Sequence, residues 1–463
     1  MKRPGLRSVA LAACFTPFVL NVAGTAEPAA IRPTPPDLPK GDAGQALRSV
    51  DVPEYRPEYR PPIETPATVA PPRRPPPPRA PTSTPRPPPS PPKPTPTVAR
   101  PAQQPPWRTQ DASIPDQSQG LVIFMIRDAG DPLAAGRAAG VEVVESAPIQ
   151  AVQLRMVVAR LRPDDSLGAA IKRLEALPHV AWAQADHNYQ SLAGPALPRA
   201  FELHDVGAAD LARPAAGVVA MIDTMVAADH AVFRGAALQQ RFYRTPMTPA
   251  AHGTAVASLI AGRAEVIGAG RGALLVNLAA FVQISPDGAP QSQTRYIAKA
   301  LDAATALRPN VLNLSFGGPE DRLLATLVAA LDARGVCMVA AAGNGGRGGR
   351  TPFPASHPLV VAVTTVDGRL APYPLATPGP AVDVAALGVD LVAATPGGYR
   401  RVSGSSFAAA IVSGALLRTP ACARDRDPAA MRAAVTGAAR DLGQPGRDPL
   451  FGAGLFRLPP GRP

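Results

Sequence analysis

Between residues 195 and 463 the chain alternates apolar runs with helical stretches, and this alternation constrains its fold more than any other feature. The continuous apolar runs, each a predicted strand, lie at 217–222, 274–284, 310–315, 335–342 and 359–364. Helical stretches at 292–307 and 322–334 separate several of them. Strands without a polar side must be covered on both faces. The sequence therefore predicts an α/β domain, a doubly wound, mainly parallel sheet with helices on both faces.

A shorter pattern over residues 119–191 predicts a separate small α+β domain. Strands are expected at 121–126, 141–144, 151–158 and 179–184, and an amphipathic helix at 166–177 follows an Asp/Ser start. This order fits a small sheet with helices on one face.

The segment before residue 119 has a different composition. Residues 28–107 hold 28 of the 59 prolines, too many for a packed core, so 27–118 is predicted to be a disordered linker. The net charge of +12 does not indicate nucleic-acid binding, because only 5 of the 47 basic residues are lysines and they are spread over the whole chain. Residues 71–110 carry seven basic and no acidic residues, which allows a weak contact with an anionic cell envelope.

The first 26 residues resemble an export signal. A basic start is followed by an apolar stretch and by small residues up to Ala26, which predicts cleavage there and a secreted or periplasmic protein. The less favoured alternative is a lipoprotein with its anchor on Cys14. The remaining cysteines, Cys337 and Cys422, could be buried thiols or a disulfide, and the sequence leaves both open.

Four polar residues lie where strands end or helices begin. Asp223 follows a predicted strand, His252 begins a helix of small residues, Asn344 stands in a glycine-rich turn and Ser406 precedes an apolar helix at 407–417. Each has a structural explanation as a cap or turn residue. Together, in the order Asp, His, Ser, they have the chain order of the subtilisin triad, and 404–408 (GSSFA) is not the Gly-x-Ser-x-Gly elbow of an α/β-hydrolase.

Several sequence blocks then resemble the subtilisin-like serine proteases. They are AMIDT at 220–224, HGT at 252–254, NLSFGG at 313–318, AGN at 342–344 and GSSFAA at 404–409. Residues 119–191 are similar to the family's propeptide. The chain departs from the family at Met225, Ala255 and Ala410, where glycine, histidine and proline are usual.

The resemblance implies a secreted serine endopeptidase made as a self-processed zymogen. Asp223, His252 and Ser406 would be catalytic, Asn344 would bind the oxyanion, and cleavage would fall between residues 189 and 193. The implied partners are protein or peptide substrates and the chain's own ferredoxin-like propeptide, without nucleic acid. No cofactor or metal is expected; calcium is possible from the family, but no site is recognisable. The implied substrate-binding residues are Ser315, Phe316, Gly317, Ala341, Ala342 and Gly343.

Two alternatives to an active protease remain. One is an inactive binding protein on the same fold, and the other is an envelope-spanning protein that acts through the proline-rich arm.

Overall fold

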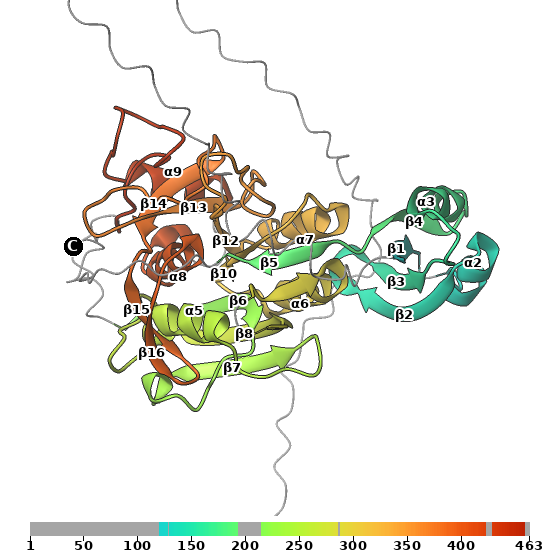
Figure 1. Cartoon of the computed structure of the whole chain (residues 1–463), viewed down its shortest axis with the longest axis horizontal. Coiled ribbons are helices and arrows are strands. Elements are labelled where there is room, and N and C mark those ends of the chain that lie inside the picture. Colours follow the sequence, from blue (N-terminus) through green and yellow to red (C-terminus); the bar gives the residue numbers. More distant parts are fainter. Residues whose placement is uncertain (1–119, 128, 193–213, 286–287, 423–427, 459–463) are drawn as a thin grey trace, which may run out of the picture. The chain divides into compact units, whose positions relative to one another are not determined.

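The computed structural model describes residues 120–127, 129–192, 214–285, 288–422 and 428–458 (Figure 1). The predicted signal peptide at 1–26, the linker at 27–118 and the beginning of the predicted catalytic domain at 195–213 lie outside the described residues. No helix in the described part of the chain is long and apolar enough to cross a membrane.

A seven-stranded sheet forms the centre of the α/β region, and it includes the five strands that the sequence predicted. Its strands pair in the order β14-β13-β12-β10-β6-β8-β7, and every neighbouring pair is parallel. Because the strands are parallel, their carboxyl ends share one edge, where ligands of such sheets usually bind. The strands are β6 (Val218–Thr224), β7 (Ala237–Phe242), β8 (Leu274–Phe281), β10 (Val311–Leu314), β12 (Cys337–Ala341), β13 (Val361–Val366) and β14 (Val382–Leu387).

Helices cover both faces of this sheet, and β6 shows how. Val219 and Met221 pack in one core with α5 (Ala251–Ala261) and α8 (Ser405–Leu416), whereas Ala220 and Ile222 pack in a second core with the helices of the other face. Those helices are α6 (Thr294–Leu307) and α7 (Arg322–Asp332). Side chains that alternate along a strand point to opposite faces. The predicted doubly wound fold is confirmed.

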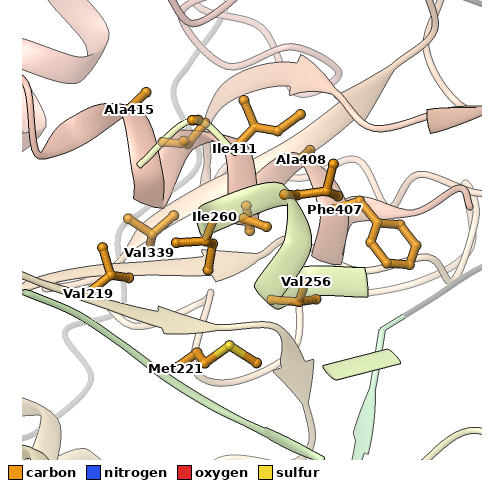
Figure 2. Packing of buried hydrophobic residues seen from close by; sticks show 14 of the residues in the cluster. Val219, Met221, Val256, Ile260, Val339, Phe407, Ala408, Ile411 and Ala415 are labelled. Carbon is orange, nitrogen blue, oxygen red and sulfur yellow. The ribbon is translucent and has the colours of Figure 1, made fainter. Parts of the chain in front are cut away.

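α5 and α8 lie side by side on one face of the sheet. Figure 2 shows Val256 and Ile260 of α5 beside Phe407 and Ile411 of α8, over β6 and β12. Every residue of α8 is buried, so this helix is fixed by contacts on all sides.

The chain after β14 is held to the sheet by several contacts. The hairpin of β15 (Leu391–Thr395) and β16 (Gly398–Val402) leads into α8, and a disulfide joins Cys337 on β12 to Cys422 in the 3-10 turn η3 (Pro420–Cys422). The open question of a free thiol or a disulfide is thus resolved in favour of the pair. The last helix is α9 (Pro428–Gly437).

Residues 121–185 form a four-stranded antiparallel sheet in the order β2-β3-β1-β4. With helices after β1 and β3, this is a ferredoxin-like arrangement. Its helices cover one face, while Ile123, Met125 and Met156 on the opposite face join the core of α6 and α7. Its elements are β1 (Leu121–Ile126), α2 (Pro132–Ala139), β2 (Glu142–Ile149), η1 (Gln150–Val152), β3 (Leu154–Arg160), α3 (Leu167–Glu175) and β4 (Val180–Ala185).

A third, three-stranded sheet joins these two regions. β5 (Asn188–Ser191) pairs antiparallel with β11 (Phe316–Gly317) on one side and with β9 (Gln291–Gln293) on the other. The sequence did not predict these short strands, nor the edge strand β7, whose side chains are mostly exposed or half-buried and do not form a continuous apolar run.

Candidate active site

Asp223 and His252 contact each other at the carboxyl edge of the large sheet. His252 Nδ1 lies 2.8 Å from Asp223 Oδ1, and because a carboxylate can only accept, the imidazole donates. Asp223 is the second-last residue of β6, and His252 is the second residue of α5. Both side chains are almost fully buried, at 1% and 3% exposed. A buried carboxylate in direct contact fixes the tautomer and orientation of the imidazole.

The close approach of α5 to β6 depends on Gly253. A Cβ at this position would lie 2.5 Å from Thr224 Oγ1, 2.7 Å from Thr224 O and 3.0 Å from Asp223 Oδ1. The Gly253 amide instead donates to Thr224 Oγ1 at 2.9 Å. The space that the missing side chain of Gly253 leaves is taken by the end of β6.

Two amide side chains hold the chain after Asp223 in place. Gln240 accepts from the Val226 amide at 2.9 Å and donates to its carbonyl at 3.0 Å. Asn277 donates to Thr224 O at 2.9 Å. The sequence analysis missed both residues, because polar positions on β7 and β8 carry no motif. Met225 is half-buried, and the Asp223 to His252 hydrogen bond forms beside it.

Ser406 is the second residue of α8 and lies in its first turn. The sequence predicted a helix that begins one residue later, at 407. Gly404 precedes the helix at φ 145°, a conformation that side chains rarely adopt. The backbone amides of a first turn have no partner inside the helix and can bind an acceptor. The neighbouring Ser405 hydroxyl accepts from the Gly343 amide at 3.2 Å, so Ser405 connects α8 to the turn after β12.

Asn344 follows β12 and points its amide nitrogen at the same place. Its Oδ1 accepts from the Ser405 amide at 3.1 Å, which fixes the orientation of the side chain. Its Nδ2 donates to the carbonyl of Leu192 at 2.6 Å. Asn344 therefore presents one N–H donor to a carbonyl beside Ser406.

The carbonyl of Leu192 occupies the centre of the site. Besides the Asn344 amide, the Ser406 hydroxyl lies 2.7 Å from its oxygen and the Ser406 backbone amide 3.4 Å from it. The Leu192 amide donates to Ser315 O at 3.2 Å. Leu192 was not among the predicted site residues, although the predicted cleavage range of 189 to 193 includes it.

Of the three catalytic candidates, Asp223 and His252 share a hydrogen bond, whereas the Ser406 hydroxyl contacts two backbone carbonyls. The rings of His252 and Phe407, the residue after Ser406, have centroids 5.7 Å apart. His252 Nε2 is buried and has no hydrogen-bond partner in the described residues. The Ser406 hydroxyl is instead within hydrogen-bond distance of the carbonyls of Leu192 and Ser315, the latter at 3.1 Å. A hydroxyl, an unpaired ring nitrogen and a buried carboxylate can together transfer a proton from oxygen.

The six predicted substrate-binding residues lie at and after the ends of β10 and β12, and two of them, Ser315 and Gly317, are close to Leu192. Phe316 and Gly317 form β11, which pairs with β5, and Ser315 precedes it. The other three are buried at and after the end of β12 and continue into Asn344: Ala341, Ala342 and Gly343.

The described residues contain no group of three or more His, Cys, Asp or Glu that could hold a metal ion. This observation does not test the expected absence of a cofactor, which stays a prediction.

The fold and this arrangement define a class of protein: a doubly wound α/β protein with a carboxylate, an imidazole and a serine hydroxyl at the carboxyl edge of its sheet. A family model described as the subtilase family matches residues 216–454, half of the chain, and the chain belongs to that family.

Individual relatives agree with this result. Subtilisin E of Bacillus subtilis (strain 168) is 30% identical over 260 residues, covering 53% of this chain and 66% of subtilisin E. Subtilisin-like protease 4 of Trichophyton equinum is 32% identical over 203 residues, covering 42% of this chain and 50% of that protein. The chain thus spans less than two thirds of either relative. The crystal structure of fervidolysin from Fervidobacterium pennivorans shares the fold, with a TM-score of 0.60 and 20% identity, covering 73% of this chain and 60% of fervidolysin.

Proposed function

We propose that this protein is a secreted serine endopeptidase, made as a zymogen that cuts its own chain after Leu192. The observation that carries the proposal is the Leu192 carbonyl, which the Asn344 amide and the Ser406 hydroxyl contact at 2.6 and 2.7 Å. A peptide bond of the chain itself thus lies where a substrate bond has to lie. Two relatives carry protease in their names, minor extracellular protease Epr of Bacillus subtilis and subtilisin-like protease 4 of Trichophyton equinum, which supports a peptide substrate.

The first chemical step is attack by Ser406 Oγ on the Leu192 carbonyl carbon. The hydroxyl turns from the carbonyl oxygens to His252 Nε2, which has no other described partner and takes the proton. Asp223, bonded to Nδ1, stabilises the imidazolium that forms. His252 then gives the proton to the leaving amine. In the second half of the reaction water attacks the acyl group, His252 takes a proton from the water, and His252 returns a proton to the Ser406 oxygen as the acyl bond breaks.

The oxyanion forms on the carbonyl oxygen that Asn344 Nδ2 already contacts. The Ser406 backbone amide, 3.4 Å away, is the second donor, and it approaches as the carbonyl carbon becomes tetrahedral. Donors that are fixed before the reaction stabilise the developing charge without reorganising. One such side-chain donor is worth roughly 3–4 kcal/mol of transition-state stabilisation.

The region at 119–191 would act as the propeptide. β5 lies between β9 and β11, so it fills the groove that an extended substrate would enter as an added strand. Additional contacts hold the small sheet against α6, including the ion pairs of Arg295 with Asp186 and of Lys299 with Glu145. While these contacts last, the site is closed to other substrates.

Export through the predicted signal at 1–26 belongs to the same proposal. One relative is named minor extracellular protease Epr, and an oxidising compartment would suit the Cys337 to Cys422 disulfide. A weak contact of the 71–110 segment with an anionic envelope also remains a proposal. An inactive binding protein is disfavoured, because the Asp223 to His252 pair is formed and the Asn344 amide and Ser406 hydroxyl both contact a peptide carbonyl.

Two adjacent serines provide the test. Ser406→Ala removes the hydroxyl beside the Leu192 carbonyl, and Ser405→Ala removes one that only contacts the Gly343 amide. We expect Ser406→Ala to lose casein digestion, self-processing and labelling by a fluorophosphonate, and Ser405→Ala to keep all three at a reduced level. An exported Ser406→Ala protein that still processes itself and digests casein would refute the proposal.

A further inference from the structure

The segment that enters the site is recognised at two side chains, Tyr189 and Leu192. Backbone pairing fixes the segment in register, with Ser191 opposite Phe316 and Gln190 opposite Gly317. Backbone hydrogen bonds alone carry no sequence information. Selectivity has to come from the spaces that receive the side chains, and the structure shows these spaces for Leu192 and Tyr189.

The space around Leu192 ends at the ring of Pro352. A Cβ on Gly317 would lie 2.6 Å from Pro352 Cγ and 3.0 Å from Leu192 Cδ1, so the proline ring and the leucine methyl approach the same point. A Cβ on Gly343 would lie 3.1 Å from Pro352 Cδ. The Pro352 ring thus lies between Gly317 and Gly343, which both belong to the predicted substrate-binding residues. Because a proline ring cannot rotate away, this end of the space is rigid.

A leucine side chain occupies this space, and we expect larger side chains to meet the Pro352 ring. The Leu192 methyl already reaches the region of Gly317 that the proline ring borders. A phenylalanine carries three ring carbons beyond the positions of the leucine methyls, and we expect these carbons to overlap Pro352. An alanine would leave the space empty. Differences of this kind in an apolar pocket change kcat/KM by roughly 10- to 100-fold.

The space around Tyr189 recognises a hydroxyl as well as a ring. Tyr189 is fully buried, its ring meets that of Phe316 edge-on with centroids 6.0 Å apart, and its hydroxyl donates to Pro319 O at 2.9 Å. A Cβ on Gly318 would lie 2.3 Å from the Tyr189 ring, so this ring packs directly on the backbone. A phenylalanine would leave the Pro319 carbonyl unpaired, which costs at least about 10-fold in binding.

We propose that the site selects chains with leucine immediately before the cut bond and tyrosine three residues earlier, and that Pro352 sets the leucine preference by closing its pocket. This inference rests on the proposed peptidase function. It makes Pro352 a specificity-determining residue of that site, and the chain's own Tyr-Gln-Ser-Leu sequence at 189–192 is the template of the preferred substrate.

The test is a peptide panel cut by the processed enzyme prepared from the full chain. The parent peptide contains Tyr-Gln-Ser-Leu-Ala-Gly, and three others carry Phe or Ala for Leu, or Phe for Tyr. We expect kcat/KM to fall roughly 10- to 100-fold for both changes of leucine and at least about 10-fold for the change of tyrosine. Equal rates for the leucine and phenylalanine peptides, or for the tyrosine and phenylalanine peptides, would overturn the inference.

Pro352→Gly then tests the pocket directly. It should raise the phenylalanine rate relative to the leucine rate by about 10-fold or more, whereas Pro358→Gly, six residues along the same segment with an exposed ring, should leave the ratio unchanged. An unchanged ratio in a folded Pro352→Gly enzyme contradicts the role of the ring. If Pro352→Gly does not fold, the wild-type panel still decides the preference. A wild-type protein that cuts no peptide and does not label at Ser406 would instead refute the peptidase function itself.

Discussion

Gly253→Ala should disable the site through packing alone, because it changes no polar group. The new Cβ would lie 2.5 Å from Thr224 Oγ1 and 2.7 Å from Thr224 O. The second of these atoms belongs to the backbone of β6, so a change of side-chain rotamer cannot relieve the overlap. The start of α5 would have to move away from the end of β6 by several tenths of an ångström.

This displacement acts on the bond between Asp223 and His252. Overpacking a rigid contact lowers the free energy of unfolding by about 1–3 kcal/mol. A misplacement of a reacting group by about 1 Å can cost about 100-fold in rate. Because the expected shift is smaller than 1 Å, we expect kcat/KM of Gly253→Ala to fall about 10- to 100-fold, together with a small decrease in the unfolding temperature.

The assay is peptide hydrolysis and thermal unfolding of the same preparation, with Gly397→Ala as the control. A Cβ on Gly397 would meet no atom within 4 Å, so this variant should match the wild type in both measurements. A Gly253→Ala enzyme with wild-type kcat/KM and stability would show that the α5 to β6 contact does not position His252, and would refute the reasoning.

Three further predictions concern the oxyanion donor, a buried carboxylate and the disulfide. Asn344→Ala should lower kcat about 100- to 1,000-fold with little change in KM, and a change in KM alone would contradict its role. Burial raises the pKa of Asp186 to about 6, whereas a free carboxyl titrates near pH 4. The folded state therefore holds this proton more tightly than the unfolded state. The resulting stabilisation is complete below about pH 4 and is lost as the pH rises through 6. In the Ser406→Ala background, Asp186→Asn should therefore gain about 2–3 kcal/mol of unfolding free energy relative to Asp186 between pH 4 and 7.5, and parallel pH profiles would contradict this. Cys422→Ser should lower the unfolding free energy by about 2–5 kcal/mol in oxidising buffer only, because it opens the Cys337 to Cys422 link across 85 residues.

The sequence was sufficient for those parts of the fold that depend on local pattern. Strands that are buried on both faces, such as β6 and β12, appear as continuous apolar runs, and the residues at their ends therefore lie at one edge of a parallel sheet. The pattern of apolar runs therefore predicts Asp223 and Asn344 at the same edge of the sheet. The blocks that resemble the subtilases supplied their expected roles.

The sequence was insufficient where a contact depends on two distant segments. β5 and β11 are short, and their pairing, which delivers Leu192 to Asn344, has no local signal. Pro352 lies in irregular chain outside the helices and strands, and only the approach of Gly317 and Gly343 shows what its ring borders. The Gln240 and Asn277 contacts after Asp223 are of the same kind, because Asn277 joins β8 to the end of β6 and Gln240 joins β7 to the loop that follows β6.

The central claim is that Ser406 cuts the bond after Leu192 of its own chain. N-terminal sequencing of the purified protein, expressed from the full-length chain, measures this most directly. The account predicts that the wild-type protein begins at Ala193 and that Ser406→Ala shows no such terminus. A wild-type terminus elsewhere in the chain, or an Ala193 terminus in Ser406→Ala, would contradict it.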